Sequence, residues 1–375
     1  MATSRAFRWS FLITLALCLL ATALLGAWWA QGRRLRAQVG DPEGLARAFL
    51  QAVEAIRHHQ AGDGYWQTLY TPGPVFERPA PEVNVFVPAL MVDLLDPVAQ
   101  ETGLTETLER AREYLRHQIE ETGLVRYHGR PDQPYLPQFG CVITPDADDT
   151  ALVWRVAPTD DHTLLHSALR ALRQYRTDEG LYRTWLASRD AYRCIDPGHD
   201  PNPADVGIQM HLYLFFARYD LRSARRLCDA LRQRISDDRI WVYYKLAPLV
   251  PLLREGNLSS AGCPLRMPES RFRQVAPGQE GYLTLSQLFR DLLLNQDPAP
   301  SLETVLQALK PLAEGAFMGL ERTPPLLFHN DFSASNPRFY WSVDVGYALW
   351  LRVYIEVARR WPGSLPLPTG SAKTP

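Results

Sequence analysis

A glutamine–glycine–aromatic pattern recurs three times in the first half of the 375-residue chain, at nearly constant spacing. The three copies begin at Gln60, Gln118 and Gln174, which are 58 and 56 residues apart. Each copy follows a helical pattern of apolar residues and leads through a glycine to an aromatic side chain. A repeat of about 57 residues accommodates two helices and two loops, so the pattern predicts a helical hairpin as the repeating unit.

The repeat constrains the fold because a row of helical hairpins must cover its two ends. Residues 37–362 have room for about six hairpins, and signals for strands are few among them. A row that stays open leaves an apolar face uncovered at each end, whereas a closed row leaves none. We therefore predict an all-α domain over residues 37–362, with the architecture of an α/α toroid. The Pro- and Gly-rich stretch 363–375 is predicted to be a disordered tail.

An apolar run, FLITLALCLLATALLGAWWA at residues 11–30, precedes this domain. It is long enough to cross a bilayer as a helix, and its two tryptophans suit the membrane interface. A cleaved signal peptide is the competing interpretation, but a tryptophan stands where cleavage requires a small residue. We favour a single-pass anchor within residues 1–36, with the lipid bilayer of a bacterial-type inner membrane as its partner. Arginines flank the run on both sides, so the side of the soluble domain is left open.

Composition and motifs exclude several classes of function. The chain has 40 basic and 41 acidic residues, which argues against a nucleic-acid partner. No Walker A, no G-x-G-x-x-G and no zinc-type cysteine spacing is present, so neither a cofactor nor a metal site is expected. Four cysteines lie outside the anchor without regular spacing and are compatible with reduced thiols or with disulfides: Cys141, Cys194, Cys228 and Cys263.

The stretch TPDADDTALVW brings three carboxylates, Asp146, Asp148 and Asp149, into four positions ahead of an apolar run. Carboxylates in contact cannot all ionise, so at least one keeps its proton near neutral pH. A protonated carboxyl is what a general acid needs. The same residues also fit the acidic first turn of an ordinary helix, with Thr144 as its N-cap and Pro145 at its first position.

Two motifs resemble a known family. Gln60, Gly64 and Trp66 form a Q-x-x-x-G-x-W pattern similar to the repeat core of squalene and oxidosqualene cyclases. DADDTA, residues 146–151, resembles the D-x-D-D-T-A signature of class II terpenoid cyclases such as squalene–hopene cyclase. The resemblance implies an α/α toroid and an isoprenoid substrate. It also implies that Asp148 protonates an alkene or epoxide, while Asp146 and Asp149 hold and polarise that acid.

A carbocation formed in this way needs a water-free cavity with aromatic walls. Seven residues are candidates for that cavity and for binding the substrate: Asp205, His211, Tyr213, His329, Asp331, Tyr347 and Trp350. His211 is the candidate hydrogen-bond partner of the aspartates. Asp205 also fits the start of a helix, and turn chemistry explains His329 and Asp331 without a site. Class II cyclases usually pair two helical domains, so a lone toroid implies a cavity in its own centre or a second subunit.

These observations lead to the hypothesis of a membrane-anchored, terpenoid cyclase-like enzyme that cyclises or isomerises an isoprenoid. Two alternatives are open. A non-catalytic scaffold or binding toroid would carry ionised, exposed aspartates and a filled centre. A carbohydrate-active α/α-barrel enzyme would need a second acid across an open groove, for which Asp205 or Asp331 is a candidate.

Overall fold

The computed structural model describes Thr22 and residues 42–132, 143–188, 202–295, 298–330 and 336–367. The longer helices in these ranges are α2 (Pro42–His59), α3 (Phe86–Leu95), α5 (Thr105–His117), α6 (Ala147–Val156), α7 (His162–Gln174), α8 (Val206–Tyr219), α9 (Leu221–Arg234), α10 (Leu249–Ser260), α11 (Glu280–Leu293), α12 (Leu302–Ala313) and α14 (Val343–Arg360). Two short helices are α4 (Ala99–Thr102) and α13 (Met318–Arg322), and the strands are β1 (Thr68–Thr71), β2 (Ala80–Glu82), β3 (Leu326–His329) and β4 (Phe339–Trp341).

The anchor predicted at residues 11–30 lies outside the described residues, except for Thr22. Within the described ranges, no helix combines the length and the apolar character that crossing a bilayer requires.

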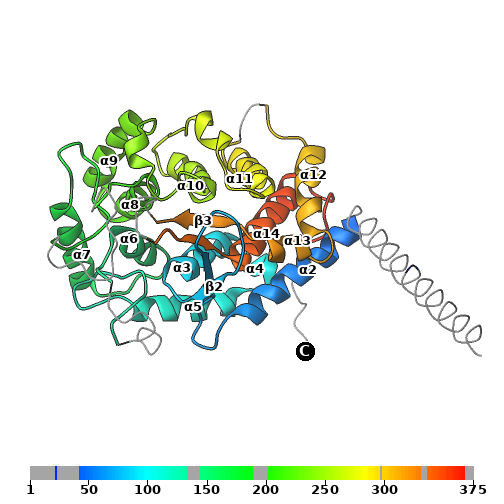
Figure 1. Ribbon diagram of the computed structural model, residues 1–375, viewed down its shortest axis with the longest axis horizontal. Coiled ribbons are helices and arrows are strands. Elements are labelled where there is room, and N and C mark those ends of the chain that lie inside the picture. The colour runs from blue at the N-terminus through cyan, green and yellow to red at the C-terminus, as the bar shows by residue number, and fades with distance from the viewer. Residues whose placement is uncertain are drawn as a thin grey trace, which may run out of the picture.

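Six helices of the described chain pack side by side in a closed ring. Along the ring, α3 contacts α6, then α8, α10, α11 and α14 follow, and α14 returns to α3. Helices α2, α5, α7, α9 and α12 pack against this ring (Figure 1). The ring helix α3 buries nine of its ten residues, whereas α7 buries only the stripe of Leu165, Ala168, Leu169 and Leu172. The closed toroid predicted from the repeat spacing is thus the architecture that the described residues adopt.

The glycines of the three repeats dock each hairpin onto the next one. All three have a positive φ, +97° at Gly64, +78° at Gly123 and +87° at Gly180. A Cβ at Gly123 would lie 2.1 Å from the carbonyl oxygen of Leu164 in α7. A Cβ at Gly64 would meet the backbone of α5 at 2.4 Å, and one at Gly180 would meet Ala230 of α9 at 3.3 Å. Only glycine combines this backbone conformation with so close an approach.

The glutamine and the tryptophan of the first repeat hold the same junction. Gln60 Nε2 donates hydrogen bonds to the carbonyl oxygens of Gly64 at 2.9 Å and of Thr107 in α5 at 2.8 Å. Trp66 Nε1 donates to the carbonyl oxygen of Ile56 in α2 at 2.9 Å. The motif on which the family resemblance rests therefore has a structural task, which is to satisfy carbonyl groups where one hairpin meets the next.

The all-α prediction is wrong in one respect, because a four-stranded antiparallel sheet with the order β2-β1-β4-β3 is present. Strand β1 pairs with β4, and Tyr70 lies opposite Tyr340. The strands are only three or four residues long and β2 contains Pro81, so they leave no alternating pattern to detect. In Figure 1, β3 lies in the middle of the ring outline, and it packs against α10. The sheet therefore supplies side chains to the inside of the toroid.

The packed domain continues beyond residue 362. Leu365 is buried in the main core, and the hydroxyl of Tyr354 in α14 donates to the carbonyl oxygen of Pro366 at 2.7 Å. Residues 363–367 thus belong structurally to the toroid.

One disulfide, Cys228–Cys263, is present within the described ranges and joins α9 to the segment that follows α10. It settles two of the four cysteines whose state the sequence left open. Cys141 and Cys194 lie outside the described residues.

Replacing Gly123 by alanine tests the docking role of the repeat glycines. The substitution combines a left-handed conformation with a backbone clash, so we expect Gly123→Ala to lower the free energy of unfolding by more than about 2 kcal/mol. The matched control is Gly62→Ala in the first repeat, because a Cβ there meets nothing within 4 Å. Urea unfolding of both variants measures the difference, and equal stabilities would contradict the docking role.

Candidate active site

Asp146 is the N-cap of α6, where its carboxylate accepts a hydrogen bond from the N–H of Asp149 at 2.8 Å. The predicted N-cap at Thr144, with Pro145 as the first helical residue, is therefore wrong by two positions. The chain is still extended at Asp146 because its N–H donates to the carbonyl oxygen of Val125 at 3.1 Å. The helix begins only after this bond has been made.

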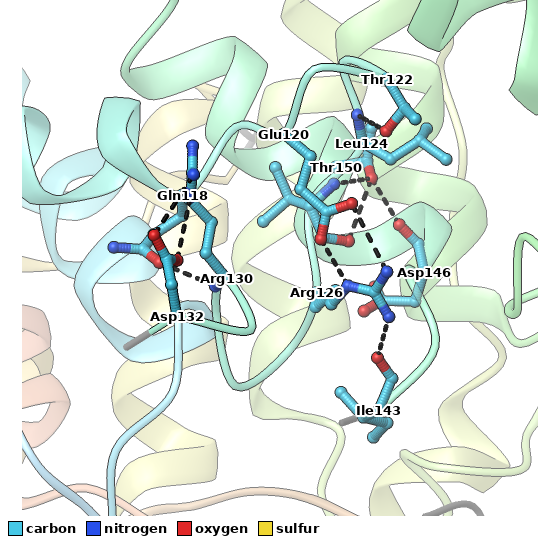
Figure 2. Close-up of polar contacts among 11 residues, drawn as sticks. Gln118, Glu120, Thr122, Leu124, Arg126, Arg130, Asp132, Ile143, Asp146 and Thr150 are labelled. Carbon is cyan, nitrogen blue, oxygen red and sulfur yellow. Dashed lines mark hydrogen bonds and ion pairs between the residues drawn. The ribbon is translucent and has the colours of Figure 1, made fainter. Parts of the chain in front are cut away.

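The segment around residues 120–126 holds the start of α6 in place (Figure 2). The hydroxyl of Thr150 accepts a hydrogen bond from the N–H of Val125 at 3.0 Å and donates to the carbonyl oxygen of Asp146 at 2.6 Å. Arg126 pairs with Glu120 and donates to the carbonyl oxygen of Ile143. Thr150, the threonine of the DADDTA motif, thus fixes the position of the acidic helix start.

Asp148 differs from its two neighbours in what it faces. Its Oδ1 contacts Nδ1 of His211, which lies on the next ring helix, α8. Asp146 and Asp149 are buried, whereas 14% of the Asp148 side chain is exposed. The structure therefore brings together Asp148 and His211, the partner that the sequence suggested, and leaves Asp148 the most accessible of the three acids.

Two arginines of the ring helices lie near Asp148 and His211. Asp93 of α3 forms ion pairs with both Arg155 of α6 and Arg254 of α10. Arg254 is fully buried, and its Nε and Nη2 have no hydrogen-bond partner among the described residues. No prediction from the sequence covered these residues, although charged residues inside the apolar runs of α3 and α10 are a signal of buried ion pairs.

Burial and the neighbouring polar groups have opposite effects on the pKa of Asp148. Burial raises the pKa of Asp148 to about 7, while the charge of Arg254 and a hydrogen bond from Tyr244 oppose that rise. Burial, together with the Arg254 and Arg155 charges, holds the pKa of His211 well below its usual range, so the imidazole is neutral. Asp148 thus keeps its proton close to neutral pH, next to a neutral histidine and a fixed positive charge.

Asp146 and Asp149 share the buried position behind Asp148. Burial raises the pKa of Asp149 well above its usual range, and the nearby Asp146 and Asp148 carboxylates raise it further. Burial also raises the pKa of Asp146, against hydrogen bonds from Asp149 that lower it. The crowding that the sequence predicted therefore exists, and it disfavours full ionisation of the group.

Asp205 has a structural task, and burial together with the Asp148 charge raises its pKa to about 7. It caps α8 and accepts hydrogen bonds at 2.8 Å from the backbone N–H groups of Gly207, Val242 and Tyr243. These bonds tie the start of α8 to the segment that carries Tyr244. A Cβ at Gly207 would lie 2.2 Å from the Tyr244 ring, so the glycine makes room for that side chain.

His329 lies on β3, next to the segment that carries Tyr244. It is fully buried, and its Nε2 accepts a hydrogen bond from the N–H of Leu246 at 3.4 Å. It therefore supports the backbone next to Tyr244. Asp331 lies outside the described residues.

The structure does not bring Tyr213, Tyr347 and Trp350 to the aspartates. Tyr213 follows His211 by two residues on α8, which places it about 200° around the helix axis. The polar atoms of the three side chains donate elsewhere, to the Ala261 carbonyl oxygen at 2.7 Å, Glu321 Oε1 at 3.1 Å and the Leu309 carbonyl oxygen at 2.9 Å, respectively.

A different set of aromatic rings, here named the aromatic cluster, lies next to the acid: Phe86, Tyr127, Phe328 and Tyr340. The ring of Phe86 is 6.0 Å from that of His211 and 5.0 Å from that of Phe328. Phe328 stacks on Tyr340 at 4.5 Å, and Tyr127 lies 6.0 Å from both. The cluster was not predicted from the sequence, because the unpredicted strands β3 and β4 supply two of its members.

Comparisons with known proteins identify the fold. No protein-family model and no curated protein matches the sequence. A solved structure of an arginine variant of the type II terpene cyclase MstE from Scytonema, in complex with its substrate geranylgeranyl dihydroxybenzoate, matches with a TM-score of 0.50 and 15% identity. The match covers 88% of this chain and 100% of that one. An apo structure of a tyrosine variant of MstE matches with a TM-score of 0.50 and 13% identity, over 88% and 99% of the two chains. The chain therefore has the fold of the type II terpene cyclases.

Proposed function

We propose that the protein is a terpenoid cyclase-like enzyme, in which Asp148 protonates an alkene or epoxide of an isoprenoid and thereby starts its cyclisation or isomerisation. The observation that carries this proposal is the position of Asp148. It is a largely buried carboxyl that keeps its proton near neutral pH, feels the charge of Arg254 and contacts His211, whose ring lies next to the aromatic cluster. The fold shared with MstE supports the same class of reaction.

An isolated alkene is a very weak base, so its acid must be both protonated and strong. Burial meets the first requirement by holding the proton on Asp148. Arg254 and His211 meet the second, because they stabilise the carboxylate that forms as the proton leaves. With its proton on Nδ1, neutral His211 donates to Oδ1 of Asp148 and leaves Oδ2 to carry the transferable proton. The O–H bond then breaks, a C–H bond forms from the alkene electron pair, and the adjacent carbon becomes the cation.

The aromatic cluster suits the cation that results. Faces of Phe and Tyr rings attract positive charge without providing a nucleophile that would trap it. Phe86 and Phe328 lead away from His211 toward Tyr127 and Tyr340, so such faces begin next to the acid.

A single toroid is sufficient for this proposal. The MstE chain is matched over its full length, so its fold requires no second helical domain in the same chain. We further propose that residues 11–30 anchor the domain to a bacterial-type inner membrane, in which isoprenoids dissolve. The Cys228–Cys263 disulfide favours the periplasmic side, because disulfides persist in oxidising compartments.

The two alternative functions receive less support. A scaffold toroid would leave its helix-start acids exposed and ionised, whereas Asp146 and Asp149 are buried. A carbohydrate-active enzyme would need a second free carboxylate, whereas Asp205 is occupied by three backbone N–H groups.

Replacing Asp148 by asparagine removes the transferable proton and preserves the shape of the side chain. We expect wild-type protein to convert squalene or geranylgeranyl dihydroxybenzoate into isomers that chromatography separates, and Asp148→Asn to reduce that conversion at least 100-fold. The matched control is Asp161→Asn, which changes the N-cap of the outer helix α7 and should leave conversion unchanged. Equal products from wild type and Asp148→Asn would contradict the assignment, as would conversion of neither probe by wild type.

The rate of conversion should depend on pH through Asp148. The reactive form is the protonated one, so activity should be constant at acidic pH and fall about tenfold per pH unit above a pKa of about 7. Initial rates between pH 5 and pH 9 measure this dependence. A rate that rises with pH over that interval would indicate a general base instead.

Deprotonation of Asp148 should lower the free energy of unfolding as the pH rises. The pKa of Asp148 is about 7 in the folded protein and its ordinary value is 3.8, so the folded state binds the proton more tightly. Its contribution to stability is fully present below 3.8 and is lost as pH rises through 7. Asp148→Asn should therefore become more stable relative to wild type between pH 4 and pH 8, by up to about 4 kcal/mol. Urea unfolding at both pH values measures this change, and a difference independent of pH would contradict it.

A further inference from the structure

A second buried carboxylate, Glu82, lies at the end of the edge strand β2. Glu82 is 2% exposed, and neither of its carboxylate oxygens has a hydrogen-bond partner among the described residues. The nearest cationic groups are His128 Nε2, 3.6 Å from Oε1, and Arg338 Nη1, 3.6 Å from Oε2. Burying a carboxylate without hydrogen bonds is costly. Glu82 thus has lone pairs available for another group.

Glu82 lies at the end of the aromatic cluster that is remote from His211. Its charge, together with burial as the larger cause, raises the pKa of Tyr127 well above its usual range. It acts in the same direction on the pKa of Tyr340, again after burial. Phe86 contacts His211 at the other end of the cluster. The cluster therefore meets His211 through Phe86 and lies near Glu82 through Tyr127 and Tyr340.

The reaction proposed above needs a proton acceptor, because a cyclic or rearranged cation becomes an alkene only by losing a proton. We propose that Glu82 is the base that takes this proton, an inference that rests on the proposed cyclase function. The C–H bond next to the cationic carbon breaks, its electron pair forms the C=C bond, and the proton moves to a carboxylate oxygen of Glu82. Asp148 has released one proton and Glu82 has gained one, so no oxidant or reductant is required.

Other carboxylates of the described chain are less suitable. Asp205 accepts three backbone hydrogen bonds, and Asp344 pairs with His59 at 2.8 Å where α2 meets α14. Asp146 and Asp149 belong to the acidic end, where their pKa values are raised by burial. Glu82 combines burial, proximity to Tyr127 and Tyr340, and ion pairs no closer than 3.6 Å.

Glu82→Gln tests the assignment, because glutamine keeps the shape of the side chain and cannot accept the proton. With geranylgeranyl dihydroxybenzoate and squalene as probes, the variant should still consume substrate, since Asp148 is intact. Alkene products should fall at least tenfold relative to products in which water has captured the cation. The latter are heavier by one water molecule, so chromatography with mass spectrometry measures the ratio.

The matched control is Glu255→Gln, which changes another buried glutamate that faces Arg290 of α11 at 3.7 Å and should leave the product ratio unchanged. Glu82→Met is a second test variant, because an apolar side chain leaves no unpaired polar atom if glutamine impairs folding.

A folded Glu82 variant with the wild-type product ratio overturns the inference and leaves the cyclase function standing. A variant with lower total conversion but an unchanged ratio also overturns it, because that result indicates a structural role. Conversion of neither probe by wild type contradicts the proposed function, and this inference with it.

Discussion

Closure of the helical ring is the constraint on which the rest of the structure depends. The contact between α14 and α3 completes it, and the pairing of β1 with β4 joins the same two parts of the chain. Asp148, His211 and Arg254 come from three different ring helices, and Asp93 comes from a fourth. These side chains meet only because the ring is closed, so the chemistry of the site is a property of the whole domain rather than of one motif.

Within that ring, two opposing effects set the pKa of Asp148, and burial outweighs the charge of Arg254. Burial alone would give a carboxyl that holds its proton but releases it reluctantly, whereas a cation in direct contact would ionise it permanently. In this structure Arg254 acts on Asp148 while remaining paired with Asp93, which moderates its charge. A protein that keeps a carboxyl in such an environment forgoes some stability.

The parts of the fold that follow local rules were predictable from the sequence. The glycines of the repeat have a positive φ and contact the next hairpin. Their spacing along the sequence therefore indicates directly how one hairpin packs on the next. The crowded aspartates and His211 were also identified, because three acids in four positions are more than capping requires. The three aspartates and each single copy of the repeat reside in a few consecutive residues.

The features that were missed depend on contacts between distant segments. Trp341 donates a hydrogen bond to Thr71, 270 residues earlier in the sequence, and no local pattern reports that the two strands meet. Glu82 reads as an ordinary polar residue after a proline, and only the sheet places it next to the aromatic cluster. Asp93 and Arg254 are charged residues within apolar runs, a signal that indicates burial without identifying a partner.

The same long-range pairing has a consequence for how the chain is made. Strand β4, which pairs with β1, and the last member of the ring, α14, are synthesised long after β1 and α3. Until they emerge from the ribosome, α3 has an almost wholly apolar surface and only part of its neighbours to cover it. At that stage the nascent chain is an incomplete ring with exposed apolar surface at both ends. Chaperones bind such species, which aggregate when synthesis stalls.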